Sequence, residues 1–446
     1  MTNLPPGPPS IDPISYMKAV FLEPGPVLRK VAAQYGDPLR TVTANGPLTI
    51  TGHPEAIRDI YTADPDVFQA YAVQVAEPVF GTTSLPVSVG ARHRRDRKLL
   101  TPPFNAGSMR AYGATIAEAA EEAARRWEPG RRFSMLETTQ DIALDVIIRV
   151  VFGVEGRERV EQVRAAVLRL IESLSPLIFV VLWTRRDFGG LGPWARYKRA
   201  IAAHDDLLLS EIQRRREVAE TRNDILSLML RSRYDDGSAM SEIEIVEQLR
   251  GLLFAGHETT AVTLACAFHW LHREPEVLGK LLCELEGLGE DAEADALASL
   301  PYLEAVCQEA LRMNPPVVDT GRSVREPFKL MGYTIPAGEG INPSPLLLHM
   351  REDLYPEPER FRPARFLERK FSPFEYIPFG GGARRCLGAA FAMYEMKIAL
   401  GTILRRYRLR SVGGKRIAFV RRGLTLGPRG GVPMMMVERR PAANKM

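Results

Sequence analysis

The sequence predicts a mainly α-helical fold with small β-sheets, formed as a single domain over residues 1–446. Long amphipathic patterns with a helical period occupy most of the chain. Strand-like patterns gather in a β-rich corner around residues 35–65 and 318–345. The sequence contains no repeats and no low-complexity linker, so one domain is favoured, although 446 residues would be enough for two or three.

The first expected element is a β-hairpin over Leu39–Thr51. In LRTVTANGPLTIT, threonine and apolar residues alternate around Asn45-Gly46, a common two-residue hairpin turn. Further strands are expected in KLMGYTIPAG, which follows Pro316, and in RIAFV and VPMMMVE near the end of the sequence. Because these segments are short, the sheets are expected to be small.

Amphipathic helices are expected between the strands, with Pro or Gly at several of their ends. The clearest patterns are ETTQDIALDVIIRVVFG, ARYKRAIAAHDDLLLSEIQRRREVAE and LPYLEAVCQEALRMNP. A longer helix is expected from Ser241, where SEIE forms a capping box, to about His272. At 1.5 Å per residue this helix would be about 45 Å long and would cross most of the domain.

Composition indicates a globular protein from a reducing compartment. Hydrophobic residues make up 45% of the chain and charged residues 25%, which excludes disordered and collagen-like chains. The four cysteines form no CxxC pair and no zinc-ligand spacing, so free thiols are expected. They are Cys266, Cys283, Cys307 and Cys386.

The sequence predicts a cytoplasmic, monomeric protein that does not span a membrane. Its longest apolar run, Pro176–Trp183, is far shorter than the ~20 residues of a membrane-spanning helix. The N-terminus MTNLPPGPPS lacks the charged and then apolar layout of a secretory signal. The net charge of +5 would suit nucleic acid, but no basic stretch is interleaved with aromatic residues, so nucleic acid is not expected as a partner.

The segment FGGGARRCLG, Phe379–Gly388, places one cysteine behind three glycines and two arginines. The glycines allow positive φ angles and close approach to a planar ligand. The following run, GAAFAMYEMKIALGTILRRY, predicts a helix, so Cys386 lies just before a helix N-terminus, where the dipole and Arg384 or Arg385 favour a thiolate. A thiolate ligand to a metal in a flat macrocycle fits this pattern. The alternatives are a cysteine that only packs and a phosphate-binding loop, although the Lys-Ser or Lys-Thr of such a loop is lacking.

The loop matches the pattern FGxGxRxCxG through Phe379, Gly380, Gly382, Arg384, Cys386 and Gly388. In this pattern the chain resembles the cytochrome P-450 superfamily. The resemblance implies a fold that holds haem b between a long central helix and the helix after the cysteine loop. Cys386 would be the axial thiolate ligand of the haem iron. Phe379 and Gly388 would belong to the haem site, and Arg384 would bind a haem propionate.

The expected central helix contains AGHETT, Ala255–Thr260, which resembles the oxygen-activation motif of the same superfamily. Glu258 and Thr259 would be the catalytic acid and alcohol that steady O2 and relay protons to it. The alternative for Thr259 is a helical threonine that only donates a hydrogen bond to the carbonyl of Ala255.

A structural ionic triad is implied by two further motifs. Glu309 and Arg312 form ExxR, a spacing that by itself indicates only a weak surface pair on a helix. PERFRPARF, Pro358–Phe366, supplies Arg360 where the superfamily completes a Glu-Arg-Arg triad. The resemblance implies that loss of this triad would prevent formation of the haem-binding fold.

Three more residues are implied as ligands of the haem propionates. His93 and Arg97 in GARHRRDRKLL match HxxxR, which is frequent in bacterial members, and Arg322 follows the ExxR helix at the expected distance. The alternative for His93, Arg94, Arg95 and Arg97 is a solvated basic helix face. The basic run Arg92–Lys98 would also steer an acidic redox partner.

The resemblance implies a haem-thiolate monooxygenase that inserts one atom of O2 into an apolar small molecule, such as a fatty acid or a terpenoid. The expected pocket residues include Ala255, Val317, Val318 and Thr425, and Asp319 adds a carboxylate to this apolar set. Electrons would come from a separate ferredoxin or flavodoxin with its reductase, because no fused reductase is expected. The alternatives are a haem-thiolate peroxygenase or isomerase and a non-enzymatic haem sensor, and the acid–alcohol pair argues against both.

Overall fold

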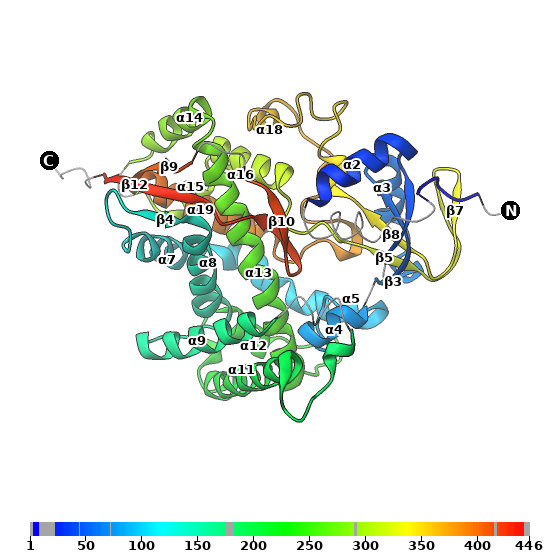
Figure 1. Cartoon of the computed structure of the whole chain (residues 1–446). Coiled ribbons are helices and arrows are strands. Elements are labelled where there is room, and N and C mark those ends of the chain that lie inside the picture. Colours follow the sequence, from blue (N-terminus) through cyan, green and yellow to red (C-terminus); the bar gives the residue numbers. More distant parts are fainter. Residues whose placement is uncertain are drawn as a thin grey trace. The chain divides into compact units, whose positions relative to one another are not determined.

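The computed structural model describes residues 3–8, 23–43, 45–71, 73–174, 178, 182–289, 292–413 and 417–440 (Figure 1). The chain divides into two compact units. The first, here called the sheet unit, comprises Met1–Ala72, Ala120–Gln140 and Thr259–Met446, and the second, the helical unit, comprises Val73–Ala119 and Asp141–Glu258. A single domain over residues 1–446 stays a prediction.

The sheet unit contains a five-stranded sheet in the order β1-β2-β8-β5-β3. Its strands are β1 (Leu39–Thr43), β2 (Gly46–Thr51), β3 (Phe68–Ala70), β5 (Arg322–Val324) and β8 (Gly340–Pro343). β2 and β8 are parallel, and the other neighbours are antiparallel. The β1–β2 hairpin lies within residues 35–65, and β5 and β8 lie within residues 318–345, the two ranges in which the sequence predicts a β-rich corner.

The predicted hairpin forms, but its turn lies one residue earlier than expected. Thr43 pairs with Gly46 across the two strands, so Asn45 lies in the turn and Gly46 already belongs to β2. Gly46 has a φ of +102°, a left-handed conformation that glycine adopts without strain. The Thr43 hydroxyl donates a hydrogen bond to the carbonyl of Gly46 at 2.9 Å, which helps to close the hairpin.

Two helices cover this sheet with apolar residues at helical spacing. α3 (Pro54–Thr62) buries Ile57 and Ile60 in one cluster with Val324 of β5 and Ile341 of β8. α2 (Pro24–Tyr35) packs against apolar side chains of β1 and β2. Burial of each such side chain stabilises the fold by about 1.5 to 3 kcal/mol. The sheet therefore sets the position of α3, which in turn contacts the cysteine loop.

The rest of the sheet unit consists of short helices, one long C-terminal helix and three small sheets. The helical elements are η1 (Pro65–Val67), α14 (Pro275–Glu286), α15 (Ala294–Ala298), α16 (Pro301–Met313), α17 (Pro345–Leu348), α18 (Arg365–Glu368), η6 (Gly382–Arg384) and α19 (Ala389–Arg406). The strands are β6 (Phe328–Leu330) with β7 (Tyr333–Ile335), β10 (Phe419–Arg422) with β11 (Thr425–Pro428), and β4 (Arg132–Ser134), β12 (Pro433–Arg439) and β9 (Tyr407–Ser411) in that order. The strands expected in KLMGYTIPAG and VPMMMVE are confirmed, and the one expected in RIAFV begins only at Phe419.

Helices form the helical unit, and α7, α8 and α13 contribute residues to both units. The elements are α4 (Val73–Phe80), α5 (Gly90–Leu100), η2 (Pro102–Phe104), α6 (Ala106–Arg110), α7 (Gly113–Ala124), α8 (Met135–Val146), the π-helical turn η3 (Ile147–Val151), α9 (Arg157–Ser173), η4 (Leu182–Arg185), α11 (Gly192–Arg216), η5 (Ala219–Thr221), α12 (Ile225–Arg231) and α13 (Glu242–Leu271). The helices expected from the amphipathic patterns are confirmed as α8, α11, α13 and α16.

The predicted capping box at the start of α13 is also confirmed. The N–H of Ser241 donates to Oε2 of Glu244 at 2.8 Å, and the N–H of Glu244 donates to Oγ of Ser241 at 3.3 Å. These reciprocal bonds satisfy backbone groups that the first helical turn leaves open. The start of the long helix is thus determined by its local sequence.

Within the described part of the chain, no helix combines the length and the apolar composition that a membrane span requires. Most of the apolar run Pro176–Trp183 lies outside the described residues. A cytoplasmic location stays a prediction.

Candidate functional site

The cysteine loop, residues 377–388, leads into α19 and is closed by backbone hydrogen bonds. The N–H of Cys386 donates to the carbonyl of Phe379 at 2.9 Å. Gly380 and Gly382 have φ angles of +63° and +61°, the positive values that the run of glycines predicts. None of the four cysteines forms a disulfide, and Cys386 is exposed. Its thiol is therefore accessible to a ligand, just before a helix N-terminus as predicted, with Gly388 as the N-cap.

The glycines of this loop also allow α3 to approach closely. A Cβ atom at Gly381 would lie 2.2 Å from the Tyr61 ring, and one at Gly382 would lie 2.5 Å from the Tyr61 carbonyl oxygen. Protein interiors are too closely packed to absorb such overlaps without movement of α3 or of the loop. Approach of a planar ligand is thus not the only reason for glycine at these positions.

Arg322 on β5 links the cysteine loop to α3 through hydrogen bonds. Its Nη2 donates to the carbonyl of Gly381 at 2.8 Å, and its Nη1 donates to the carbonyl of Ile60 at 3.2 Å. The guanidinium also lies 4.9 Å from the centre of the Tyr61 ring. Among the described residues, no carboxylate pairs with this buried side chain, and its Nε has no hydrogen-bond partner. Burial lowers the pKa of the Arg322 guanidinium, because a cation without a carboxylate is costly to desolvate.

The other expected propionate ligands lie on two separate elements. Arg384 is the last residue of η6, and its side chain is half-buried. His93 and Arg97 lie one turn apart on α5 in the helical unit, where His93 is buried and Arg97 is half-buried. Contact of these three residues with a propionate stays a prediction.

Much of the basic run on α5 is paired with acids. Arg92 lies 2.6 Å from Glu244 and 3.3 Å from Asp96. Arg95 lies 3.2 Å from Asp96, which is buried. Arg95 is exposed, as on a solvated basic face, but Asp96 on α5 and, at 3.8 Å, Glu244 in the first turn of α13 pair with it. Arg94 is exposed.

The AGHETT motif lies near the middle of α13, as predicted. Ala255 is exposed, and Glu258 and Thr259, three and four residues later, are half-buried. Residues at this spacing share one side of a helix, so the motif presents an accessible side. A Cβ atom at Gly256 would lie 3.4 Å from Cδ1 of Ile147, so glycine here also lets the turn η3 pack against α13.

Two segments expected to line a substrate pocket meet in the sheet unit. The N–H of Leu426 in the β10–β11 hairpin donates to the carbonyl of Pro316 at 2.8 Å. A Cβ atom at Gly427 would lie 3.1 Å from Cγ2 of Val262, so the hairpin also touches α13 three residues after Thr259. The β10–β11 hairpin, α13 and the segment that follows α16 therefore meet at one junction.

Three of the four expected pocket residues, Val317, Val318 and Thr425, lie at this junction, and Ala255 belongs to the helical unit. Val317 is half-buried, and Val318 and Thr425 are buried. The hydroxyl of Thr425 donates to a backbone carbonyl of its own turn at 3.1 Å. Asp319 is exposed and forms an ion pair with Arg421 of β10 at 2.7 Å, an arginine that no sequence motif indicated.

Glu309 and Arg312 on α16 form a fully buried ion pair with two parallel hydrogen bonds. Nε of Arg312 donates to Oε2 of Glu309 at 2.7 Å, and Nη2 donates to Oε1 at 2.8 Å. Oε1 of Glu309 also accepts from Nε of Arg365 at 3.1 Å and from the N–H of Arg362 at 2.9 Å. A weak surface pair is therefore wrong, and the ion-paired cluster contains Glu309, Arg312 and Arg365.

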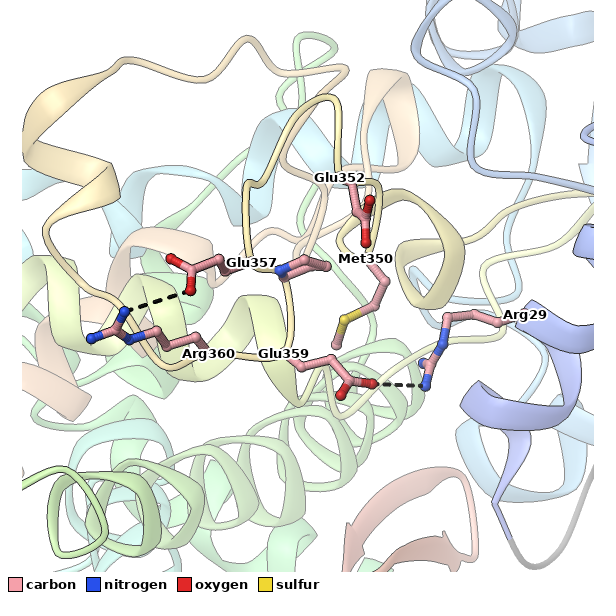
Figure 2. A pocket seen from close by; sticks show the side chains of 7 residues that line it. Arg29, Met350, Glu352, Glu357, Glu359 and Arg360 are labelled. Atoms are coloured by element: carbon pink, nitrogen blue, oxygen red, sulfur yellow. Dashed lines mark ion pairs between the residues drawn. The ribbon is translucent and has the colours of Figure 1, made fainter.

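Arg360, the arginine expected to complete the triad, is not part of it. Its side chain is 60% exposed and lies 3.6 Å from Glu357, beside a surface pocket of about 590 Å³ (Figure 2). Arg365 is only 3% exposed and reaches Glu309. Arg360 contributes only its carbonyl, which accepts from two arginines of the cluster at 3.4 Å. PERFRPARF contains PxRF twice, and the second copy, Pro363–Phe366, supplies the buried arginine.

His349 joins this cluster to the cysteine loop, although no motif pointed to it. Nη1 of Arg312 donates to the carbonyl of His349 at 2.7 Å, and Nδ1 of His349 lies 3.2 Å from the carbonyl of Arg312. Nε2 of His349 accepts from the N–H of Ile377 at 3.0 Å, at the start of the loop. Burial lowers the pKa of His349 to about 3, so the ring is neutral and donates from Nδ1.

Comparison with known proteins points to one family. The family model for cytochrome P-450 matches residues 5–431. Cytochrome P-450 138 of Mycobacterium tuberculosis is 34% identical to this chain over 420 residues, which cover 93% of this chain and 92% of the relative. Cytochrome P-450 135B1 of the same species is 36% identical over 371 residues, which cover 82% of this chain and 77% of the relative.

Two solved structures share the fold. A retinoic-acid-bound cyanobacterial cytochrome P-450 matches with a TM-score of 0.86 and 24% identity, over 99% of this chain and 100% of that one. The haem domain of cytochrome P-450DA matches with a TM-score of 0.87 and 22% identity, over 99% of both chains. The mainly α-helical fold with small β-sheets is thereby confirmed.

Proposed function

Because the chain belongs to the cytochrome P-450 family of haem-thiolate monooxygenases, we propose that it inserts one atom of O2 into an apolar small molecule. The reaction class follows from the family match, which extends over nearly the whole chain. The roles of individual residues, the substrate class and the redox partner are proposed from the chain's own residues.

One observation carries the proposal: the exposed Cys386, which forms no disulfide, closes a glycine loop directly before α19. A thiolate in this position is stabilised by the helix dipole and by open backbone N–H groups. We propose haem b as the cofactor, and Sγ of Cys386 would bind its iron. When bound, the haem supplies the reduction of O2 and the transfer of one oxygen atom.

The surroundings of the cysteine loop fit a cofactor that carries carboxylates. Arg322 is buried beside the loop, and among the described residues it has no carboxylate partner and its Nε has no acceptor. A propionate would neutralise this cation through charge-assisted hydrogen bonds. Arg384, His93 and Arg97 are proposed as further propionate ligands because their motifs match those of the family.

Glu258 and Thr259 are proposed to deliver protons. They supply a carboxyl and a hydroxyl group on the accessible side of α13. In this role the hydroxyl of Thr259 holds a proton at Oγ1 for transfer to O2, and the carboxyl of Glu258 resupplies it. Ala255, one turn earlier, leaves space for a substrate because its side chain ends at Cβ.

A separate ferredoxin or flavodoxin with its reductase is proposed as the electron source. Arg94 on α5 and Arg385 in the cysteine loop are exposed cations. Exposed cations attract an acidic partner over distances of about one Debye length, and this attraction weakens as salt increases. A monomeric state and a cytoplasmic location stay predictions.

The test is a turnover with the purified holoenzyme, a bacterial ferredoxin and its reductase, NADPH and oxygen-18-labelled O2. The proposal predicts that each product molecule carries one labelled oxygen atom and that the second atom leaves as water. Product with oxygen from the solvent would contradict it. Turnover that needs hydrogen peroxide and never responds to the reductase would instead indicate a peroxygenase.

A further inference from the structure

Arg421 is a mostly buried cation. It lies at the junction where the β10–β11 hairpin meets α13 and the segment that follows α16. It lies on β10, and its Nη2 is 2.7 Å from Oδ2 of Asp319. The hairpin is tied to the segment of Asp319 by the hydrogen bond from Leu426 to Pro316. Figure 1 shows this hairpin, in red, beside the green helix α13. A cation is thus built into the part of the sheet unit that is proposed to bind the substrate.

The two members of this ion pair differ in how easily they leave it. The side chain of Asp319 is 63% exposed, whereas that of Arg421 is 15% exposed. An exposed carboxylate such as that of Asp319 regains water when it leaves an ion pair, so its own loss of free energy is small. A buried guanidinium without a carboxylate is much less favourable. Arg421 therefore keeps its position, and another carboxylate can replace that of Asp319 as its partner.

The backbone around Arg421 is held independently of Asp319. β10 pairs with β11 in a regular antiparallel register from Phe419 with Pro428 to Arg422 with Thr425. The turn is closed by the Thr425 hydroxyl, and Gly427 lies against α13. Removal of the Asp319 carboxylate should therefore leave the guanidinium in place.

Several residues beside this pair in the sequence or across the hairpin are apolar. Arg421 lies opposite Leu426, Val317 and Val318 directly precede Asp319, and Val262 of α13 lies close to Gly427 of the hairpin. Arg422, the next residue on β10, is a second cation. A ligand that fits both features combines an apolar body with one anionic group. Arginine binds carboxylates through charge-assisted hydrogen bonds, so a carboxylic acid is the simplest such ligand.

We propose that Arg421 determines substrate specificity and that the substrate is an apolar carboxylic acid, such as a fatty acid or an isoprenoid acid. The substrate carboxylate replaces that of Asp319 beside Arg421. Asp319 pairs with the cation when no acid is bound, and it competes with the substrate carboxylate. This inference rests on the proposed function, because it takes the junction as part of the substrate site.

The test measures the spin-state change of the ferric holoenzyme during titration with matched acids and alcohols. The probes are dodecanoic acid with 1-dodecanol and farnesoic acid with farnesol. We expect the wild type to bind each acid more tightly than its alcohol. Arg421→Gln should weaken acid binding by about 10- to 100-fold, because a charge-assisted hydrogen bond is lost, and should leave alcohol binding unchanged.

Two further variants sharpen the test. Asp319→Asn removes the competing carboxylate and should tighten acid binding by up to about fivefold, without effect on the alcohols. Arg408→Gln is the matched control, because Arg408 lies on β9 and pairs with Glu438 at 3.5 Å, outside the junction. It should change neither titration.

If Arg421→Gln lost equal affinity for the acid and for the alcohol, the arginine would have a structural role and the inference would be overturned. A wild type that responds to the alcohols but not to the acids would overturn it as well. If neither class changes the spectrum although the carbon monoxide complex shows a thiolate-ligated haem, the acid substrate is wrong and the proposed function stands. If that complex lacks the thiolate signature, the proposed function fails and the inference falls with it.

Discussion

Arg360 and Arg365 lie in the same short segment, and only Arg365 reaches the carboxylate of Glu309. The side chain of Arg365 is 3% exposed, whereas that of Arg360 is 60% exposed and pairs with Glu357. Exposed ion pairs contribute about 0 to 1 kcal/mol, but removal of one member of a buried pair costs about 3 to 5 kcal/mol. For these two arginines, burial therefore indicates the role better than the match to a sequence motif.

Arg365→Ala should lower the free energy of unfolding by about 3 to 5 kcal/mol and reduce the haem content of the purified protein. Arg360→Ala is the matched control from the same segment, and it should change the free energy of unfolding by less than about 0.5 kcal/mol. Urea denaturation and the ratio of haem to protein measure these effects. Arg365→Lys, which keeps the charge, should recover part of the loss. Equal effects at the two positions would rule out Arg365 as the buried partner of Glu309.

Glu395 on α19 gives a second prediction at the residue scale. It is buried, and among the described residues its Oε1 has no hydrogen-bond partner. Burial raises the pKa of Glu395 from the ordinary 4.5 to about 8. The folded protein thus keeps a proton that the unfolded chain releases above about pH 4.5. This contribution to stability is complete below pH 4.5 and is lost as the pH rises to about 8.

Glu395→Gln keeps the shape of the side chain but cannot ionise. Its melting temperature relative to that of the wild type should therefore rise between about pH 5 and about pH 8. Glu276→Gln, at an exposed position of α14, is the control and should follow the wild type. Melting curves at three pH values give the comparison. A constant difference between Glu395→Gln and the wild type would mean that the folded protein does not hold this carboxyl in its neutral form.

At the scale of elements, the cysteine loop depends on its glycines for two different reasons. Gly380 and Gly382 have nearly the same positive φ, +63° and +61°. A Cβ atom at Gly380 would meet nothing within 4 Å, whereas one at Gly382 would lie 2.5 Å from the carbonyl oxygen of Tyr61. The first position requires only a left-handed conformation, and the second also requires space for α3.

Gly380→Ala should therefore destabilise the protein by about 1 to 2 kcal/mol, the cost of a left-handed alanine. Gly382→Ala should lose at least about 1 kcal/mol more, because the backbone of α3 or of the loop has to move. Urea denaturation of both holoenzymes measures the difference. If the two substitutions were equally costly, close packing of Tyr61 against the loop would not contribute to stability.

The basic helix α5 gives a prediction about electron transfer. Arg94 is exposed, whereas Arg95 pairs with Asp96 at 3.2 Å and lies 4.0 Å from the centre of the Tyr234 ring. Arg94→Glu should slow ferredoxin-driven turnover and weaken its salt dependence, while peroxide-driven turnover stays the same, because rim charges act mainly on association. Arg95→Glu should lower both, because it disrupts an ion-paired cluster. An Arg94→Glu enzyme with normal ferredoxin kinetics would show that this residue does not steer the partner.

At the scale of the whole molecule, the features that followed from the sequence are those with local causes. The capping box of Ser241 and Glu244 marks the start of α13, and the glycine run predicts the positive φ angles of the cysteine loop. Contacts between distant residues could not be predicted in the same way. Arg322 reaches Gly381, which lies 59 residues later, and no local pattern indicates that pairing.

The family signature identified some of its residues more clearly than others. It marks Cys386 clearly, because FGxGxRxCxG occupies one short loop. It marks the second arginine of the triad poorly, because PERFRPARF offers two arginines with the same flanking residues. Only the folded chain distinguishes them, by burying Arg365 against Glu309.

The central claim is that Cys386 binds the haem iron as a thiolate, and the spectrum of the reduced holoenzyme under carbon monoxide tests it most directly. We predict a strongly red-shifted Soret band in the wild type and in variants with serine at Cys266, Cys283 or Cys307. Cys386→His should abolish this band. A band that persists in Cys386→Ser and disappears when one of the other three cysteines is replaced would contradict the assignment.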